Sequence, residues 1–564
     1  MKQLMSRQFQ EFAKDPRYRE SIQALLCDYE EAKRETPPPL SARLRSLFLS
    51  KGTREEFERP YFKKRSCTAE AGLLALIFPE EEAYLAVLKK YLYSTCREIS
   101  WALPAHLVNV ADEMTCVDLF AAETACMLAE ICTALEDRLG DGLVDLIKEQ
   151  IHRRVLSPYL ENAFWWEDGK SNWTAVCCGN IAIAMMRIAP ELFEREKDRI
   201  LHAMAQYISA FPDDGNCPEG MHYWNFGFGR WVWFADVLYA YSEGKCDLFQ
   251  DEKVKQIAAY AQKMFLKGKA TVSISDSDRA EKADAALLSF LHGKYEGCAL
   301  VPKELTKSDF GDVPWLSRSR YFLYGADVSY PQSLPLRNYL FRDSAQAIVN
   351  TERYSLAVKG GHNGESHNHN DVGSFILATD EGQIFCDLGA GRYFNGYFNS
   401  DIRYSLINNA SWGHSVPIID GSFQREGRQF CGDLAWDGNE ITVDFAEAYG
   451  GAATKLKRTF RYDEGRIVLT DEYAGCRELT ERFVTVVKPK FVSDGVQVGN
   501  VRLTSKDAVP KITESRFERH GYKKRKSEKV YLIDFVFSGK ERASFCFTVL
   551  DTNIISKNSI TTAP

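Results

Sequence analysis

The chain has 564 residues, a length that predicts more than one domain and an ample buried core. Hydrophobic residues make up 45% and charged residues 26%, as in ordinary globular proteins, and no apolar run approaches the roughly 18 residues of a membrane span. The net charge of −7 argues against a general binder of nucleic acid or membranes, while a locally charged cleft could still take an anionic substrate. The composition gives no indication of the oligomeric state.

The N-terminus and the cysteines indicate a compartment. Residues 1–12 contain no apolar segment ending in a small-residue cleavage site, and they predict an amphipathic helix rather than a signal peptide. The 15 cysteines are odd in number and scattered, and no CxxC pair stands out. Reduced thiols fit this pattern better than a disulfide framework, so we expect a cytoplasmic protein.

Apolar residues recur at helical spacing through the first half of the chain. The stripe over residues 120–139 predicts a helix that Gly140 ends, and residues 231–241 predict another. Many such segments with short turns between them predict paired helices, in a helical domain over residues 1–325. Two prolines within Ser329–Pro335 mark a linker after this domain.

Residues 336–564 predict a β domain, because short runs of β-branched and aromatic residues alternate there with turn residues. No helical pattern lies between these runs, so an antiparallel β-sandwich is the expected architecture. The basic run Lys523–Lys526 is expected in an exposed hairpin loop. The expected strands are Ser374–Thr379, Gln383–Cys386, Glu440–Phe445, Arg458–Tyr462, Arg466–Thr470, Phe483–Val487, Val530–Phe537 and Ala543–Leu550.

Three aromatic segments of the helical half could form a cleft for sugars: Trp101–His106, Phe164–Thr174 and Asp213–Gly229. Aromatic faces stack on sugar rings, and glycines let the backbone approach a ligand closely. The alternative is that these aromatic residues pack in the core. The candidates for substrate contact are Trp101, His106, Trp173, Glu219, His222 and Trp224.

The segment Gly364–Gly389 carries the strongest chemical signal. In a β-strand, alternate side chains share a face, so His367 and His369 would lie together, and a returning strand could bring Asp387 beside them. Two imidazoles and a carboxylate suit Zn²⁺, and a third histidine could close the site. Paired histidines also occur in polar loops, which is the alternative interpretation.

Taken in chain order, these segments resemble the heparinase II/III-like polysaccharide lyases. The resemblance rests on Asn172-Trp173, Pro218–Trp224, His367–Gly373, Asp387–Gly389 and Trp412–Gly421. It implies a multidomain fold, an incomplete (α/α) toroid followed by an antiparallel β-sandwich, with the substrate cleft between them. It also implies β-elimination on uronic-acid-containing chains of glycosaminoglycan or alginate type, with 4,5-unsaturated uronate products.

The resemblance implies roles for particular residues as well. Asn172 would hydrogen-bond the substrate carboxylate, Tyr223 would act as base, acid or both, and His367 would be a partner base or a neutralising group. A lyase needs these roles because it must stabilise an enolate-like carboxylate, remove a proton and protonate the leaving oxygen. His369, Asp387 and His414 would hold a structural divalent metal, with zinc the best candidate, and no organic cofactor is expected.

Two departures from the family pattern leave alternatives open. Asn172 is followed by Trp173, where some relatives have a histidine shortly after the asparagine, and His414 is followed by serine rather than the commoner asparagine. A metal-dependent glycoside hydrolase could also use the His-x-His and Asp cluster, with a metal-bound water. A non-catalytic carbohydrate-binding protein would need only the aromatic cleft. Formation of an ultraviolet-absorbing product discriminates between elimination and these alternatives.

Overall fold

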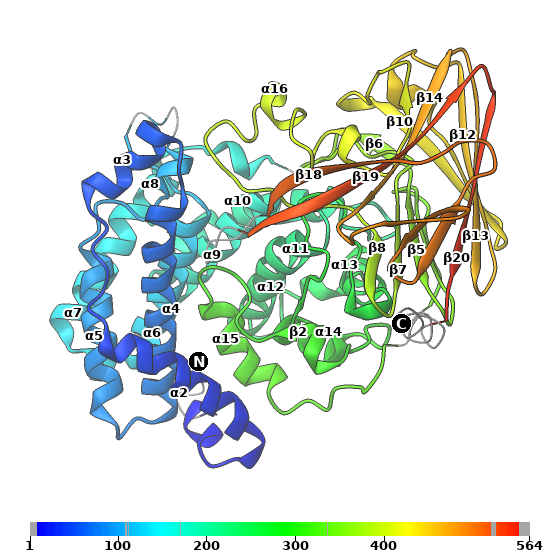
Figure 1. Cartoon of the computed structure of the whole chain (residues 1–564). Coiled ribbons are helices and arrows are strands. Elements are labelled where there is room, and N and C mark those ends of the chain that lie inside the picture. Colours follow the sequence, from blue (N-terminus) through cyan, green and yellow to red (C-terminus); the bar gives the residue numbers. More distant parts are fainter. Residues whose placement is uncertain are drawn as a thin grey trace, which may run out of the picture. The chain divides into compact units, whose positions relative to one another are not determined.

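The computed structural model describes residues 8–107, 110, 112–169, 171–334, 337–519 and 526–551, which form two compact units (Figure 1). The helical unit comprises the described residues within Met1–Phe211, Tyr223–Ala258 and Lys282–Ser333. The β unit comprises those within Pro212–His222, Ala259–Glu281 and Leu334–Pro564. The first seven residues of the predicted N-terminal helix and residues 523–525 of the basic run lie outside the described residues.

Helices of 5 to 23 residues build most of the helical unit. They are α2 (Arg19–Arg34), α3 (Ala42–Lys51), α4 (Glu55–Ile77), α5 (Glu82–Cys96), α6 (Leu119–Leu139), α7 (Asp141–Ile151), α8 (Ser157–Glu161), α9 (Asn172–Ile188), α10 (Pro190–Ser209), α12 (Gly229–Tyr241), α13 (Glu252–Ala258), α14 (Ala285–Lys294) and α15 (Trp315–Arg320). Helix α6 begins where Asp118 accepts hydrogen bonds from the backbone N–H groups of Phe120 and Ala121, and it ends at Gly140. Helices α6 and α12 confirm the two stretches predicted from periodicity.

Successive helices of this unit pack as hairpins. Helix α4 contacts α5, α6 contacts α7 and α9 contacts α10, and each pair is joined by a short connection. Contacts of α6 with α4 and α9, and of α9 with α12, join one pair to the next (Figure 1). The predicted paired-helix organisation is therefore confirmed.

The β unit is built from three antiparallel sheets in its described part. The strand orders are β15-β16-β17-β20-β13-β12-β11-β10-β6, β18-β19-β14-β9 and β3-β4-β5-β7-β8. Their bounds are β3 (Tyr339–Phe341), β4 (Gln346–Asn350), β5 (Ser355–Lys359), β6 (Gly361–Asn363), β7 (Phe375–Thr379), β8 (Gly382–Phe385), β9 (Ile418–Ile419), β10 (Gly427–Trp436), β11 (Glu440–Asp444), β12 (Lys455–Tyr462), β13 (Arg466–Ala474), β14 (Glu478–Thr485), β15 (Lys490–Val492), β16 (Gly495–Val498), β17 (Val501–Thr504), β18 (Lys511–Arg519), β19 (Lys526–Ser538) and β20 (Arg542–Val549). All eight expected strands are present, within a few residues of the predicted bounds.

A shared aromatic core holds the sheets face to face. Phe375 on β7 packs edge-on against Phe460 on β12, with the ring centroids 5.3 Å apart. Phe385 on β8 contacts Phe547 on β20 at 5.1 Å, and their rings are nearly perpendicular. Edge-to-face pairs of this kind stabilise a core beyond their buried area. The two sheets that contain these strands therefore form a sandwich, as predicted.

The β unit takes in two segments that the sequence-based boundaries assigned to residues 1–325, namely Pro212–His222 and Ala259–Glu281. Polar contacts explain this difference. Asp214 accepts hydrogen bonds from the backbone N–H groups of Asp343 and Ser344, and Gln383 donates to the backbone oxygen of Thr271. Such long-range pairings carry no periodic signal in the sequence.

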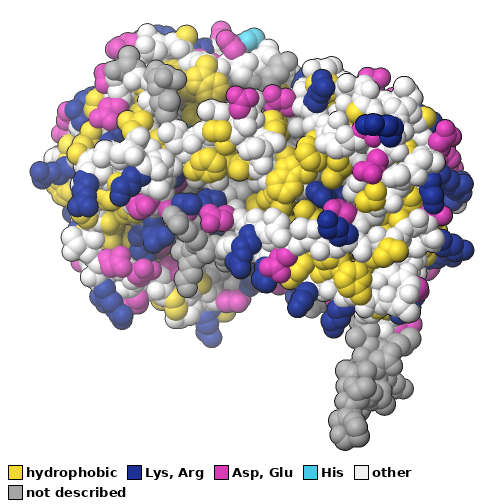
Figure 2. Space-filling view, turned by 45° about the horizontal axis from the view of Figure 1, so that its top comes forward, with side chains coloured by type: hydrophobic (Ala, Val, Ile, Leu, Met, Phe, Trp, Pro, Cys, Tyr) yellow, Lys and Arg dark blue, Asp and Glu magenta, His cyan; other side chains and the backbone are white. Residues whose placement is uncertain are grey.

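The surface carries charged side chains of both signs, as the composition of the chain leads us to expect (Figure 2). On the face shown in Figure 2, Lys and Arg side chains are interspersed with Asp and Glu side chains. Within the described ranges, no helix combines the length and the hydropathy that a membrane crossing requires.

Candidate active site and metal centre

Three candidate metal ligands meet in loops of the β unit. His369 lies in the loop between β6 and β7, Asp387 follows β8, and His414 follows the 3-10 turn η11 (Ser411–Gly413). One ligand atom from each residue lies within 4.8 Å of the other two, and all three residues are buried. The spatial cluster predicted from the sequence is therefore present.

Gly389 explains how the Asp387-Leu-Gly segment holds its carboxylate. Its φ of +68° lies in the left-handed region, and a Cβ built there would lie 2.0 Å from the backbone oxygen of Ser277. The N–H of Gly389 donates to Oδ1 of Asp387 at 2.8 Å. Only glycine permits this close turn, which aims the carboxylate at the histidines.

The hydrogen bonds of the two imidazoles leave their Nδ1 atoms facing Asp387. Nε2 of His369 donates to Oδ1 of Asp276 at 3.2 Å, and Nε2 of His414 donates to the backbone oxygen of Asn408 at 3.0 Å. Carboxylate and carbonyl oxygens only accept, so in the neutral form of each ring the proton is on Nε2 and the lone pair is on Nδ1. Both Nδ1 atoms and Oδ2 of Asp387 are buried and have no hydrogen-bond partner among the described residues. Converging lone pairs of this kind, with the other ring nitrogen fixed by an oxygen, are typical of a metal site.

Asp387 is the acidic member of this cluster. Burial opposes its ionisation, yet positive charge on the His414 and His369 rings holds the pKa of that carboxyl well below its usual range. Asp387 is therefore an ionised carboxylate, which is the form that binds a cation.

His367 is not on a strand, which corrects the prediction that strand alternation places it beside His369. The described residues between β6 and β7 form turns, and His367 has a φ of +55°. This left-handed conformation costs a non-glycine residue about 1–3 kcal/mol, and such strain is concentrated at functional sites. The side chain is held by Asp276, whose Oδ2 lies 2.7 Å from Nδ1 of His367.

Asp276 is the main site residue that sequence reasoning missed. It is 3% exposed and lies 91 positions before His367 in the chain. Burial opposes its ionisation, but Arg403 and the two histidines keep the pKa of Asp276 well below its usual value. Its side-chain partners are His367, His369, Tyr393, Tyr397 and Arg403. Its only sequence signal is a polar run, Ser275–Asp278, which resembles an ordinary loop.

Glu219 and His222 lie on a segment that packs against the one carrying Asp276. Gly220 has a φ of +86°, and a Cβ there would lie 2.2 Å from Oγ of Ser277, so the two stretches are in close contact. The N–H of His222 donates to the same hydroxyl, and its ring Nδ1 lies 3.3 Å from Glu281. Glu219 is buried, whereas the His222 side chain is 42% exposed and can reach a ligand.

Asn172 and the Tyr223 segment come together within the helical unit. Asn172 begins α9 and is buried. Tyr223 is half-buried and precedes the π-helical turn η5 (Trp224–Phe228). A Cβ on Gly227 of this turn would lie 2.9 Å from Cβ of Asn172, so glycine is what allows η5 to approach α9.

Two tryptophan candidates lie in the core of the helical unit. Trp101 is 1% exposed and donates its indole N–H to the backbone oxygen of Thr95. Trp224 is fully buried and donates to the backbone oxygen of Ile257. Neither ring offers a face to a sugar, so their packing role outweighs the predicted substrate contact, and the proposed site leaves both out.

His106 and Trp173 belong instead to a group of aromatic rings that reaches the surface. The rings of His106 and Trp173 meet edge-on with centroids 4.9 Å apart, and Trp165 lies 5.1 Å from Trp173. Trp165 is 66% exposed, so one large ring is available for stacking. Asp118, which sequence reasoning did not single out, lies 2.7 Å from Nδ1 of His106 and orients that ring.

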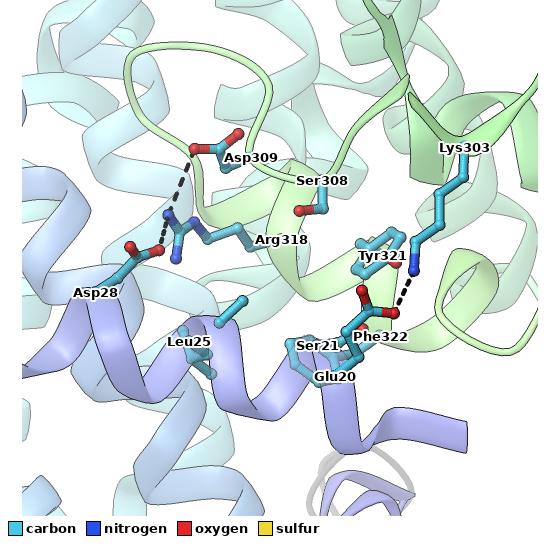
Figure 3. Close-up of a pocket in the computed structure, with 11 residues that line it drawn as sticks. Glu20, Ser21, Leu25, Asp28, Lys303, Ser308, Asp309, Arg318, Tyr321 and Phe322 are labelled. Atoms are coloured by element: carbon cyan, nitrogen blue, oxygen red, sulfur yellow. Dashed lines mark hydrogen bonds and ion pairs between the residues drawn. The ribbon is translucent and has the colours of Figure 1, made fainter. Parts of the chain in front are cut away.

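A cavity of about 280 Å³ lies elsewhere in the helical unit, beside α2 (Figure 3). Lys303 on its wall is 2.6 Å from Glu20, and Arg318 is 2.9 Å from Asp28 and 3.5 Å from Asp309. The cationic groups are therefore neutralised by carboxylates of the same cavity. It offers an anionic sugar no uncompensated positive charge, and we do not assign the active site to it.

Comparisons with known proteins agree with this picture. Residues 335–535 match the family model of the heparinase II/III-like C-terminal domain. The fold is similar to that of heparinase III, with 14% identity and a TM-score of 0.64 over 89% of this chain and 78% of that one. It is similar to a heparan sulfate lyase from Pedobacter heparinus, with 12% identity and a TM-score of 0.56 over 95% and 89% of the two chains. It is also similar to a chondroitin AC lyase from Streptomyces coelicolor A3, solved with chondroitin sulphate, with 11% identity and a TM-score of 0.57 over 99% and 84%. No curated protein sequence matches the chain.

The family match lies in the C-terminal part of the chain. Residues 335–535 resemble the heparinase II/III-like C-terminal domain, which confirms the resemblance inferred from the motifs. At such low identities the solved structures establish the likeness of fold, and they confirm the predicted helical toroid followed by an antiparallel β-sandwich.

Proposed function

We propose that the protein is a polysaccharide lyase that cleaves uronate-containing glycosaminoglycans by β-elimination. The observation that carries the proposal is His367, which has a left-handed backbone conformation and a hydrogen bond to the buried Asp276, within the segment that matches the heparinase II/III-like domain model. A partly buried, hydrogen-bonded imidazole on a strained backbone is costly to maintain and is expected where chemistry needs it. The likeness of fold to heparinase III and chondroitin AC lyase supports the same class.

The proposed residues cover the three needs of an elimination. The amide of Asn172 donates to the uronate carboxylate and spreads the charge that develops when the C5 proton leaves. Tyr223 exchanges protons with C5 and with the leaving oxygen at C4, alone or together with His367. Since Nδ1 of His367 donates to Asp276, the lone pair of His367 is on Nε2, which is the atom that can accept a proton. No water enters the bond cleavage.

His369, Asp387 and His414 fit a divalent cation, and Zn²⁺ suits two imidazole nitrogens and a carboxylate. A bound ion would supply a fixed positive charge that joins three loops of the β unit. The donor residues are buried, with His369 and His414 0% exposed and Asp387 3% exposed. A polysaccharide cannot reach such a site, so the observation favours a structural ion over the water-activating ion of a hydrolase.

The partner we propose is an anionic glycosaminoglycan or an oligosaccharide derived from it. The names of the similar structures, heparan sulfate lyase and chondroitin AC lyase, support this class, and alginate-type chains are the next candidates. The exposed ring of Trp165, with Trp173 and His106 behind it, is proposed as a stacking surface for the sugar. All 15 cysteines are free thiols, which supports the proposed cytoplasmic location.

A panel of heparan sulfate, chondroitin sulfate, hyaluronan and alginate, each as polymer and as oligosaccharide, tests the proposal. We expect ultraviolet absorbance to rise with at least one of them, because elimination creates a conjugated 4,5-unsaturated uronate. A His367→Ala protein that melts like the parent serves as the matched control and should show a rate at least about 10²-fold lower. Absence of absorbance with every chain, from folded and metal-loaded protein, would refute the lyase assignment.

A further inference from the structure

We propose that Asp276 is a positioning residue that couples the metal cluster to His367, with each of its two carboxylate oxygens holding one imidazole. The inference rests on the proposed function to the extent that His367 acts on the substrate. It goes further, because it assigns a role to a residue that no motif identified and links two groups with different functions.

The geometry of the carboxylate carries the proposal. Oδ2 lies 2.7 Å from Nδ1 of His367, and Oδ1 lies 3.2 Å from Nε2 of His369. One side chain therefore sets the tautomer and the ring orientation of both imidazoles. It orients His369 within the cluster of His369, Asp387 and His414, and it places the lone pair of a neutral His367 ring on Nε2. A rotation of the carboxylate would disturb both rings together.

A second layer of contacts fixes Asp276 itself. Arg403 reaches it through Nη2 at 3.3 Å, and the hydroxyls of Tyr393 and Tyr397 donate to it at 3.1 and 3.4 Å. The guanidinium of Arg403 also donates to the backbone oxygen of Asn368 at 3.0 Å, and Asn368 lies between the two histidines in the chain. The same arginine thus holds both the carboxylate and the loop that presents its partners.

The segment that carries Asp276 is tied to the third metal ligand as well. Oγ of Ser273 donates to the backbone oxygen of Asp387 at 3.2 Å, and the N–H of Ala390 donates to the backbone oxygen of Ser277 at 3.3 Å. A displacement of the metal ligands would therefore be transmitted to Asp276 through the backbone, as well as through His369.

The variant Asp276→Asn distinguishes a positioning role of this residue from a purely structural role. The asparagine keeps the shape, but its amide nitrogen cannot accept a hydrogen bond, so only one of the two imidazoles keeps its acceptor. The matched control is Asp278→Asn, the same change two residues away, where the carboxylate pairs with Arg519 at the surface. Zinc affinity is measured by chelator competition, metal geometry by the visible spectrum of the Co²⁺-loaded protein, and turnover on a chain that the parent cleaves.

We expect Asp276→Asn to weaken zinc binding by roughly 10-fold to 100-fold and to lower kcat by about 10²-fold, with KM within about threefold of the parent. Asp278→Asn should leave all three quantities within about threefold. Parent-like zinc affinity together with parent-like kcat in the folded Asp276→Asn protein would overturn the proposal, as would a loss confined to KM.

A second variant keeps the inference testable if Asp276→Asn does not fold. His367→Ala removes the other partner of the carboxylate without touching a metal ligand. Coupling predicts that this change alters the Co²⁺ spectrum and shifts zinc affinity several-fold, whereas an unchanged spectrum and affinity would contradict it. These readouts need no substrate, so the coupling is judged even if the parent cleaves no polysaccharide and the proposed function fails. A parent protein that binds neither zinc nor cobalt would refute the coupling.

Discussion

Nδ1 of His414 lies 3.0 Å from Oδ2 of Asp387, and no hydrogen bond joins these two buried atoms. Since Nε2 of His414 donates to a backbone carbonyl, a neutral His414 ring places the lone pair of Nδ1 opposite a carboxylate oxygen. The contact is favourable only when a cation, either a metal ion or a proton on Nδ1, lies between the two atoms. His369 presents its own Nδ1 to Asp387 at 3.7 Å, which makes the arrangement a three-donor site.

Loss of the proposed ion should destabilise the protein. Metal bound at a thousandfold excess over its Kd stabilises by about 4 kcal/mol, and this corresponds to roughly 10 °C in the melting temperature of a 150–250-residue unit. We expect Asp387→Asn and chelator treatment each to lower both metal content and melting temperature, measured by elemental analysis and calorimetry. His362→Ala is the control, since His362 pairs with Glu365 outside the cluster. Equal melting temperatures for the metal-free and the metal-loaded protein would contradict the prediction of a stabilising ion.

Tyr223→Phe tests the proposed proton transfer, because the change keeps the ring and removes only the hydroxyl. We expect kcat to fall by about 10²-fold to 10⁴-fold while substrate binding is largely kept. Tyr239→Phe, on the exposed face of α12, should turn over within about twofold of the parent. Turnover by folded Tyr223→Phe within a few-fold of the parent would remove Tyr223 from the mechanism.

Gly227→Ala should damage both stability and activity. The added Cβ would lie 2.6 Å from the hydroxyl oxygen of Tyr207 and 2.9 Å from Cβ of Asn172, so η5 must move away from α9. Overpacking of this kind costs about 1–3 kcal/mol. Gly142→Ala is the matched control, since a Cβ there meets nothing within 4 Å and alanine is a better helix former. Equal melting temperatures and equal turnover for the two variants would show that the close approach is unimportant.

The raised pKa of Glu70 predicts that the stability of the helical unit depends on pH. Burial raises its pKa to about 7, against the partial opposition of Arg318. The folded-state pKa of Glu70 is higher than its unfolded-state pKa. Its contribution to the free energy of unfolding is therefore fully present below about pH 4.5 and is lost as the pH rises through about 7. We expect Glu70→Gln to be more stable than the parent by up to about 3 kcal/mol at pH 8 and nearly equal at pH 4.

Melting curves at the two pH values check the Glu70 prediction. Glu130→Gln is the contrasting variant, because burial opposes ionisation of Glu130 but the buried Arg320 and Arg187 hold the pKa of its carboxyl well below the usual value. Its loss leaves a buried charge without its counter-ion and should destabilise the protein at both pH values. A stability difference between Glu70→Gln and the parent that is the same at pH 4 and pH 8 would contradict the assignment.

Much of the fold was predictable because it depends on local pattern. Helix α6 follows from an apolar stripe with Asp118 at one end and Gly140 at the other, and the β12–β13 hairpin follows from alternation on either side of an Asp-Glu-Gly turn. The boundary between the units was less predictable. The segment Ala259–Glu281 joins the β unit through individual polar contacts that leave no periodic trace.

The residues of the candidate site also differ in how far the sequence predicts them. The metal cluster could be predicted in part from the His-x-His pair and Asp387, because imidazoles and a carboxylate suit a metal ion, and the resemblance to the heparinase II/III-like lyases added His414. The strand geometry assumed for His367 was wrong, since this residue lies in a turn with a positive φ and its side chain bonds to Asp276, which is remote in the sequence. Asp276 itself could not be identified, because a single aspartate in a polar run becomes informative only when the fold brings five partners to it.

The most direct test of the central claim is the mass balance of one cleavage. A defined tetrasaccharide from the chain that the protein cleaves is digested, and both products are weighed by mass spectrometry. Elimination predicts that the two product masses sum to the mass of the substrate, with the unsaturated uronate on one product, because no water is added. Products that together exceed the substrate by one water, with no ultraviolet-absorbing end, would show hydrolysis and contradict the lyase assignment.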